Sequence, residues 1–261
     1  MATATLAAET IPHFAGLDTS PRKAAVPYGL PIVDDCMTCK LRGSNFFCGL
    51  SQSSMKALDS MKHTSSYPEG SIVFMEGQAA RGVYIVCQGR AKLMTTSSDG
   101  KTLILKIVQP GEVLGMHSVV AGKAHEFTVE TLQPCQLAFI SRDDFLRFIR
   151  ERGDACLQAA QHISRDCQSA YDVIRSIGLS HSVSEKLARL LLQWSTDAPI
   201  KDGTIRVKLA LTHEELAQLI GSTRETVTRT LGDFKKRSVA ELRGSTLLIT
   251  NPAALKTLAA G

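Results

Sequence analysis

Three patterns of apolar and polar positions follow one another along the chain, and each predicts a different kind of element. From about residue 67 to residue 140, short β-branched runs alternate with glycine turns such as Asp99-Gly100, a strong hairpin signal. Strands this short and evenly spaced are typical of a small barrel or sandwich. The clearest predicted strands are residues 71–74, 82–87, 91–94 and 103–108.

The second pattern is a heptad repeat, which lies in a helical region that begins near Asp143. Its apolar residues recur at steps of four and three, the spacing by which two identical helices pack as a coiled coil. A stripe buried within one monomer is the alternative. Gly178 and residues 180–184 are expected to form a hinge, followed by a helix near residues 185–195. The candidate dimerisation residues are Cys156, Ala160, Ile163, Cys167, Ala170, Ile174 and Ile177.

The third pattern, in residues 211–231, predicts two short helices around a glycine turn. Thr212 with Glu215 has the form of a capping box, and Ser222 with Glu225 repeats that form for the second helix. Glycine takes positive φ without steric cost, so the single glycine between the two helices suits a sharp turn.

The second of these helices has the pattern of a recognition helix for the DNA major groove. Val227 and Leu231 form its inward stripe, which leaves a polar face near its N-terminus. An arginine there can bond guanine O6 and N7, and a glutamate can accept from cytosine N4. A surface helix with merely solvated charges is the alternative. A β-hairpin wing is expected at residues 241–250. The candidate DNA contacts are Thr212, Ser222, Arg224, Glu225, Thr228 and Arg229.

Composition and charge narrow the class of protein. Hydrophobic residues make up 44% of the chain and charged residues 21%, as in ordinary globular domains. The net charge of +5 is modest, but residues 223–237 hold five basic side chains against two acidic ones, which suits contacts with phosphate groups. Motifs of common catalytic sites, such as Gly-x-Ser-x-Gly, are absent from the sequence, so we expect no enzyme.

The apolar segments and the N-terminal residues predict the compartment. No segment approaches the roughly 18 apolar residues of a membrane span. Residues 1–30 lack a secretion signal, and their Ala, Thr and Pro content is that of a mobile tail. We therefore expect a cytoplasmic protein whose seven cysteines stay reduced. Such cysteines are more naturally metal ligands or core residues than disulfides.

Residues 211–231 also carry a family resemblance. The residues Leu211-Thr212, Leu216-Ala217, Gly221 and Ser222 to Arg229 resemble the helix-turn-helix of the CRP/FNR transcription regulators, and the similarity extends from about residue 36 to the C-terminus. The glycines of the strand-rich region resemble those of the cyclic-nucleotide-binding β-roll: Gly70, Gly77, Gly89, Gly111 and Gly115.

This resemblance implies an α+β fold with an N-terminal cyclic-nucleotide-binding-like β-roll, a long dimerisation helix and a C-terminal winged helix-turn-helix. It implies a homodimeric transcription regulator that binds palindromic double-stranded DNA, with RNA polymerase as a further partner and no membrane association. Arg224 matches the CRP branch, whereas the best-known FNR proteins have an apolar residue there, so the half-site is expected to resemble TGTGA more than TTGAT. The expected domains are 1–50 (tail and cysteine loop), 51–150 (β-roll), 151–179 (dimerisation helix) and 180–261 (DNA binding).

The predicted β-roll departs from the family pattern for cyclic nucleotide binding. Nucleotide-binding members have a glutamate in the glycine cassette and an Arg-Ser pair about ten residues on. Here Met116 falls at the glutamate, while His125 and Glu126 fall at the Arg-Ser pair. A phosphate needs a charge partner, and Glu126 would repel it. Cyclic nucleotide is therefore disfavoured as the signal.

The cysteines favour an iron–sulfur signal. Cys36, Cys39 and Cys48 place three thiols on a short loop, and Cys135 lies at the end of the roll. Four thiolates are what a [4Fe–4S] cluster needs, and a remote ligand would tie the loop to the folded domain. The arrangement resembles the oxygen-sensing FNR branch, apart from a longer gap between Cys39 and Cys48. Loss of the cluster to oxygen would shift the protein towards a monomer or a misaligned dimer.

Three alternatives to the cluster stay open. The same cysteines could hold zinc, with His63 as a fourth ligand, or act as a thiol switch without metal. Residues 115–118 resemble the segment with the proximal haem histidine of the carbon-monoxide-sensing branch, although a glycine here replaces the cysteine that precedes that histidine. Cys87, Cys156 and Cys167 are interpreted as core or seam residues, which cysteine suits well.

Overall fold

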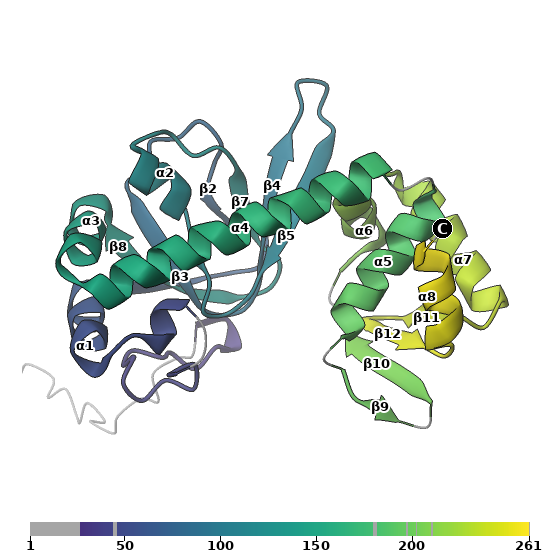
Figure 1. The fold of residues 1–261 in the computed structure, drawn as a ribbon, viewed down its shortest axis with the longest axis horizontal. Helices are drawn as coiled ribbons and strands as arrows, with labels where there is room; N and C mark the ends of the chain where they lie inside the picture. The colour runs from purple at the N-terminus through teal and green to yellow at the C-terminus, as the bar shows by residue number, and fades with distance from the viewer. Residues whose placement is uncertain are drawn as a thin grey trace, which may run out of the picture.

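A long helix joins the two halves of the molecule in a computed structural model of the chain (Figure 1). The structure describes residues 27–43, 46–179, 182–196, 198–201, 203–209 and 211–260, without the side chains of residues 27, 46, 176, 177 and 201. Most of the predicted tail and part of the predicted hinge thus lie outside the described residues. Helix α4 (Gly153–Leu179) runs along the β-rich half and ends beside the C-terminal half.

Two four-stranded antiparallel sheets form the β-roll. The strand order is β1-β8-β3-β6 in one sheet and β2-β7-β4-β5 in the other. The small sandwich and its four clearest strands, expected from the sequence, are therefore confirmed. The strands are β1 (His63–Tyr67), β2 (Ile72–Phe74), β3 (Gly82–Gln88), β4 (Ala91–Thr96), β5 (Thr102–Val108), β6 (Val113–Leu114), β7 (Thr128–Thr131) and β8 (Cys135–Ser141).

Alternation along β3 and β8 builds two separate apolar cores. Ile85 and Ala138 belong to an outer core, which also contains residues of the helices. Val86, Leu137 and Cys135 belong to an inner core of the roll. Successive side chains of a strand point to opposite faces, so each of these two strands contributes to both cores.

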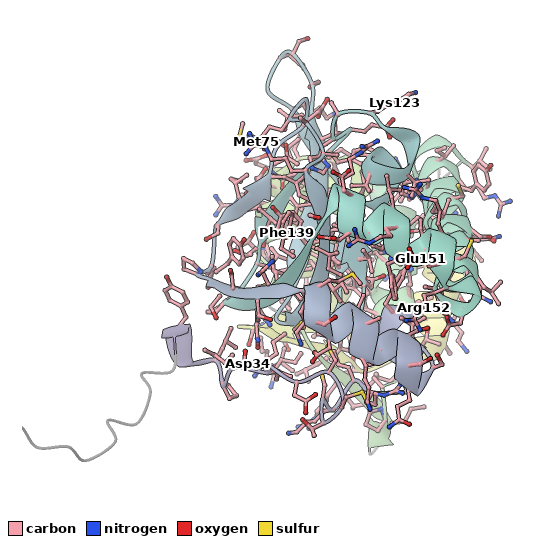
Figure 2. All side chains as sticks on the ribbon, turned by 90° about the vertical axis from the view of Figure 1, so that its left-hand side faces the viewer. Asp34, Met75, Lys123, Phe139, Glu151 and Arg152 are labelled. Atoms are coloured by element: carbon pink, nitrogen blue, oxygen red, sulfur yellow. The ribbon has the colours of Figure 1, made fainter. Side chains whose placement is uncertain are left out.

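Four helices pack on the outer core: α1 (Gln52–Met61), α2 (Met116–Ala121), α3 (Arg142–Glu151) and α4. The expectation of one helix from Asp143 onward is corrected, because α3 and α4 are separate. Arg152 between them has an extended backbone, with φ of −124° and ψ of 105°. Figure 2 marks this junction by the labels of Glu151 and Arg152.

Helix α4 has one buried stripe and one exposed stripe. Ala155, Ala159 and His162 are buried against the roll. The described residues of the predicted seam are exposed, except Ile163, which is half-buried. The side chain of Ile177 lies outside the described part. Ile174 is 65% exposed. A seam buried within one monomer is therefore excluded, and the stripe is free to pack against a second helix.

The C-terminal half is a small unit with its own core, in which Leu187, Leu216, Val227 and Leu247 are buried. The strand order of its sheet is β11-β12-β10-β9, and β11-β12 is the hairpin expected at residues 241–250. None of the helices in the described part of the chain has the length and apolar character to cross a bilayer. The elements are α5 (Val183–Ser195), β9 (Ile200–Lys201), β10 (Thr204–Lys208), α6 (His213–Ile220), α7 (Arg224–Lys236), β11 (Ala240–Arg243), β12 (Thr246–Ile249) and α8 (Pro252–Ala260).

Asp154 joins the start of α4 to the start of α1. Its carboxylate accepts hydrogen bonds from the Ser51 backbone N–H at 3.1 Å and from the Ser54 hydroxyl at 2.7 Å. Burial opposes ionisation, but the bonds from Ser54 and Ser51 outweigh it and lower the pKa of Asp154 to about 2. The carboxylate therefore stabilises this junction in its charged form.

We expect Asp154→Asn to reduce the free energy of unfolding at pH 7 by about 1.5–3 kcal/mol, the usual contribution of hydrogen bonds to a charged group. A depressed pKa stabilises the fold above the unfolded value of about 3.9, and this contribution is lost as the pH falls towards about 2. Urea denaturation should therefore show a larger difference in the free energy of unfolding between the variant and the wild type at pH 7 than at about pH 3. The control is Asp143→Asn, at a side chain 92% exposed. Equal losses for both variants would contradict the prediction.

Candidate functional site

Helices α6 and α7 are the two helices expected around the glycine turn. The Thr212 hydroxyl accepts from the Glu215 backbone N–H at 3.2 Å, and Glu215 Oε2 accepts from the Thr212 N–H at 2.8 Å. The predicted capping box of the first helix is thus present. Gly221 ends this helix with φ of 63°, in the left-handed region that glycine favours.

The capping box expected for the second helix is corrected. Helix α7 is capped by Thr223, whose hydroxyl accepts from the Thr226 N–H at 3.3 Å, and Ser222 is not the cap. Two adjacent hydroxyl residues offer the same chemistry, and the extended backbone of Thr223 decides which one is used. Glu225 therefore makes no capping bond to Ser222 and lies exposed in the first turn.

The outer face of α7 presents side chains predicted to contact DNA. Arg224, Glu225, Thr228 and Arg229 are exposed, while Val227 is fully buried on the opposite face. The first two lie in the first turn, where a recognition helix meets base edges. The arrangement leaves both arginines accessible to a groove.

The other predicted contacts are more constrained. The Thr228 hydroxyl donates to the Arg224 carbonyl at 2.8 Å and lies 2.9 Å from His213 Nδ1, so its methyl group is the part left for a base. The Thr212 hydroxyl serves the capping box, and Ser222 is half-buried at the turn. The sequence pattern gave no signal for His213, because its contact crosses from one helix to the other.

An ion-pair triad joins the β-roll to the helix-turn-helix. Lys92 Nζ on β4 lies 3.4 Å from Glu215 Oε1 on α6 and 3.0 Å from Glu130 Oε1 on β7. The Lys92 side chain is only 11% exposed, so water screens this contact weakly. Glu215 thus both caps α6 and fixes it against the roll.

A cavity of about 670 Å³ lies between the roll and α4. Its walls are mainly apolar and come from β4, β5, residues 112–118 and one face of α4. Cys167, Ala170 and Ile174 of the predicted seam line part of it. The seam and the cavity therefore share one face of the long helix.

A polar cluster around Asp166 of α4 occupies one side of this cavity. Lys106 Nζ lies 2.9 Å from Oδ1, and His117 Nε2 and His162 Nδ1 lie 3.3 and 3.0 Å from Oδ2. Glu112 pairs with Lys106 at 2.6 Å. Burial opposes the charge of Asp166, but these partners outweigh it and hold its pKa well below the usual range. The cluster links β5, α2 and α4.

The described residues that line the cavity offer a phosphate no free cation. His125 is buried and stacks on Phe74 with ring centroids 3.8 Å apart, and burial lowers its pKa. Glu126 is an acidic residue in the lining. Lys106, the one lysine or arginine among the described lining residues, is paired with carboxylates. This environment supports the expectation that cyclic nucleotide is disfavoured.

The arrangement also does not fit haem ligation through His117. The imidazole lies at the cavity, but its Nε2 is 3.3 Å from Asp166 Oδ2. The hydrogen bond to Asp166 is the main cause that raises the pKa of His117. Ligation through Nε2 would have to break this contact.

Two protein anchors hold the N-terminal cysteine loop on the roll. The buried Gln136 side chain accepts from the Val33 N–H at 2.9 Å and donates to the Val33 carbonyl at 2.8 Å. Near the other end, Phe47 is fully buried and its ring centroid lies 5.7 Å from that of Phe145 and 6.5 Å from that of Phe148. The loop is therefore fixed at both ends by contacts that need no cofactor.

Four cysteines surround a cavity of about 30 Å³ beneath this loop: Cys36, Cys39, Cys48 and Cys87. Burial raises the pKa of Cys48 to about 11 and that of Cys87 to about 12, and neighbouring thiols of the set add to each rise. As they stand, no three His, Cys, Asp or Glu side chains in the described residues converge closely enough to hold a metal ion.

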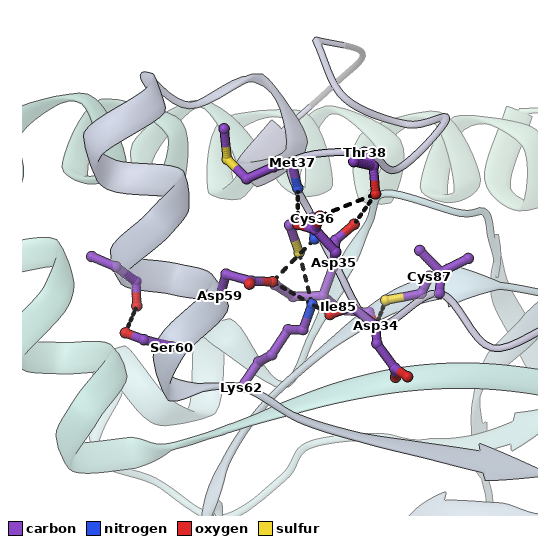
Figure 3. A network of polar contacts seen from close by, with 12 residues as sticks. Asp34, Asp35, Cys36, Met37, Thr38, Asp59, Ser60, Lys62, Ile85 and Cys87 are labelled. Atoms are coloured by element: carbon purple, nitrogen blue, oxygen red, sulfur yellow. Dashed lines mark hydrogen bonds and ion pairs between the residues drawn. The ribbon is translucent and has the colours of Figure 1, made fainter.

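A polar network ties Cys36 to the end of α1 (Figure 3). Lys62 Nζ lies 3.1 Å from Cys36 Sγ, 2.5 Å from Asp59 Oδ1 and 2.6 Å from the Asp34 carbonyl oxygen. Asp59 Oδ1 also accepts from the Cys36 backbone N–H at 3.1 Å. Burial opposes the lysine charge, but Asp59 and Cys36 outweigh it and raise the pKa of Lys62. A cation is therefore held beside the thiol.

Cys135 lies in the other core. Its thiol donates to the carbonyls of Arg90 and Gln133, both at 3.2 Å, and its side chain packs inside the roll. Ala138, an even-numbered neighbour on β8, lines the cysteine cavity instead. Cys135 and the loop cysteines therefore lie in different cores, because alternate strand residues face opposite sides. The ligand set expected from sequence stays a prediction. Cys87, which the sequence predicts to be a core residue, is the cysteine that lines the cavity with the three loop cysteines.

A sensory-type β-roll, a long helix with an exposed apolar stripe and a winged helix-turn-helix define a DNA-binding regulator. The family model of the cyclic nucleotide-binding domain matches residues 64–152, and that of the Crp-like helix-turn-helix domain matches residues 185–258. The chain belongs to the CRP/FNR family of transcription regulators. Regulators of this family bind DNA and act as dimers.

Individual relatives differ in the signals that their names state. The chain is 27% identical over 212 residues to the CRP-like cAMP-activated global transcriptional regulator of Mycobacterium tuberculosis, covering 81% of this chain and 94% of that protein. It is 25% identical to the nitrogen fixation regulation protein FixK of Bradyrhizobium diazoefficiens, covering 86% and 94%. The structure of FixK2 from Bradyrhizobium japonicum has a TM-score of 0.67 at 21% identity, covering 77% and 98%, and shows the same fold.

We expect cyclic AMP to show no saturable binding to the full-length protein in isothermal titration calorimetry and to leave its DNA affinity unchanged. The reason is that an acidic residue and a neutralised lysine line the cavity where a phosphate would need a cation. Glu126→Gln is the control, since it removes a like charge without adding a cation and should not bind either. Saturable binding by the wild type would contradict this expectation.

Proposed function

We propose that this regulator adjusts its DNA affinity to the chemical state of the N-terminal cysteine loop. The supporting observation is the position of Phe47, which directly precedes Cys48 and is buried against α3. The short 3-10 helix η2 (Phe46–Gly49) around it also contacts α4. A change at the thiols would therefore act on the segment that supports the start of the long helix.

The route from the loop to DNA runs through α4. Asp154 in its first turn is bonded to Ser51 and Ser54, which directly follow the loop. Pairing of two copies along the seam would place two recognition helices about 34 Å apart, one turn of DNA. Oxidation or metal release at the loop would shift the population between aligned and misaligned dimers. Dimerisation through residues 151–179 and contact with RNA polymerase belong to the same proposal.

The residues do not fit a [4Fe–4S] cluster with the ligand set expected from sequence. Such a cluster takes four thiolates, whereas Cys135 lies in a different core from the three loop cysteines. The cavity among the loop thiols, about 30 Å³, is small beside the cavity of about 670 Å³ under α4. The proposal therefore rests on the thiols themselves, with dioxygen or another oxidant as the signal. Cluster ligation by Cys36, Cys39, Cys48 and Cys135 stays an alternative that requires rearrangement.

Oxidation of the reduced full-length protein with diamide should change its affinity for a palindromic TGTGA-type duplex by at least about fivefold, the lower end of ordinary allosteric coupling. Fluorescence anisotropy measures the affinity, and dithiothreitol should restore it. Cys48→Ser should abolish the response, because it removes a loop thiol. Cys156→Ser, on the exposed stripe of α4, should keep it. If the DNA affinity of the wild type is the same before and after oxidation, the proposal is refuted.

Arg224→Ala should weaken binding to that duplex by about 1–3 kcal/mol and relax the preference at one base position, because a bidentate contact with guanine would be lost. Competition with duplexes substituted at each half-site position measures this. Lys236→Ala, at the far end of α7, is the control: it should weaken all duplexes equally if it contacts phosphate. Uniform weakening by Arg224→Ala as well would show that Arg224 does not contact a base.

A further inference from the structure

We propose that Cys36, Cys39, Cys48 and Cys87 form a site for one thiophilic divalent cation of the Zn²⁺ class. The inference deepens the proposed function, on which its regulatory meaning rests, because it gives the cysteine loop a defined bound state. It differs from the expected cluster in its fourth ligand and in holding a single ion.

Three of the four proposed ligands lie on the N-terminal loop, and the fourth lies on a strand of the β-roll. The spacing of Cys36 and Cys39 is that of paired cysteines in structural zinc sites. Cys87 belongs to β3. This strand is paired on both sides, with β8 and β6, so the position of Cys87 is fixed by the sheet. A cation bound by all four would close the loop onto the roll.

The number of thiols around the cavity matches one ion. A zinc ion takes four sulfurs at about 2.3 Å in a tetrahedron, and four cysteines line this cavity of about 30 Å³. The thiols stand apart around the cavity. Rotation of a cysteine side chain between staggered χ1 wells moves its sulfur by about 3 Å, and metal binding would include such rotations.

The hydrogen bonds at Cys36 and Cys39 run in the opposite direction to those at Cys135. The Leu41 N–H donates to Cys39 Sγ at 3.4 Å, and the Lys62 ammonium donates to Cys36 Sγ at 3.1 Å. Hydrogen bonds donated to a sulfur stabilise its thiolate form, which is the form that binds a metal ion. The Cys135 thiol instead donates to two carbonyl oxygens, which would repel a thiolate. Its surroundings suit a neutral thiol. Cys87 Sγ lies 3.8 Å from the Ile85 carbonyl oxygen, a long contact that metal binding would release.

The charges around the cavity suit an anionic metal site. Four thiolates and one divalent cation leave a net negative charge, and both Lys62 and Arg42 line the cavity. The Lys62 side chain is only 6% exposed and has Asp59 as its carboxylate partner. Arg42 Nη1 donates to the Cys48 carbonyl at 3.2 Å. Two cations so placed lower the cost of burying thiolates.

Metal analysis and cobalt titration of the full-length protein test the site. The wild type should contain one zinc per chain. Co²⁺ added to the metal-free protein should give sulfur-to-cobalt charge transfer and the intense visible bands of a tetrahedral tetrathiolate. Cys87→Ser should weaken Co²⁺ binding at least about tenfold, because a hydroxyl does not replace a thiolate for a thiophilic ion. Cys135→Ser, the matched change on the inner face, should bind as the wild type does.

Three results would overturn the site: no stoichiometric metal in the wild type, iron with acid-labile sulfide in place of zinc, or metal lost in Cys135→Ser but kept in Cys87→Ser. If Cys87→Ser does not fold, X-ray absorption of zinc-loaded Cys135→Ser decides. Four sulfurs at about 2.3 Å support the site, and three or fewer refute it.

DNA affinity measured on the same samples separates this inference from the proposed function. A metal that binds without changing DNA affinity leaves the site standing and removes its regulatory role. Oxidation-dependent DNA affinity in a protein that binds no metal has the opposite meaning, since it refutes the site and leaves the thiol-dependent regulation intact.

Discussion

The carboxylate of Asp166 determines how the long helix lies on the β-roll. Lys106 from β5 and His117 from α2 meet it from the roll, and His162 meets it from the preceding turn of α4. A partly buried charge with several partners is costly to leave unpaired, so this face of α4 must stay inward. Ile174, about two turns further along α4, lines the same cavity as Asp166 but is 65% exposed, so it is open to a second copy. In the proposed dimer, the pairing of the two long helices would depend on this orientation.

Two candidate signal sites, the cysteine loop and the large apolar cavity, contact α4 at different points along its length. The cysteine loop meets its first turns through Phe47 and Asp154, whereas the large apolar cavity lies along its later turns. The output end has a contact of its own, from Lys92 to Glu215. In the proposed mechanism, α4 would transmit a displacement from the cysteine loop to the DNA-binding half. The cavity offers a phosphate no free cation in its described lining, so the thiols are the better candidates for the signal.

Local patterns in the sequence predicted local structure well. The capping pair Thr212 and Glu215, the turn at Gly221 and the strands at 82–88 and 102–108 all follow from spacing and residue type, because each depends on neighbours in the chain. Two predictions of local structure were wrong. Helix α7 is capped by Thr223 and not by Ser222, and the region from Asp143 forms two helices that are separated at Arg152, because competing local conformations are close in energy.

The sequence by itself determined the family, the reading helix with its Arg224 and Arg229, and the presence of three thiols on one loop. The tertiary structure decided which thiol joins them. Sequence spacing cannot tell Cys87 from Cys135, because both lie at or next to the ends of strands in the same sheet. Pairing of β3 with β8 places Cys87 under the loop, and strand alternation turns Cys135 towards the inner core. Facing direction in a sheet is a property of the packed fold, and it assigns the two cysteines to different environments.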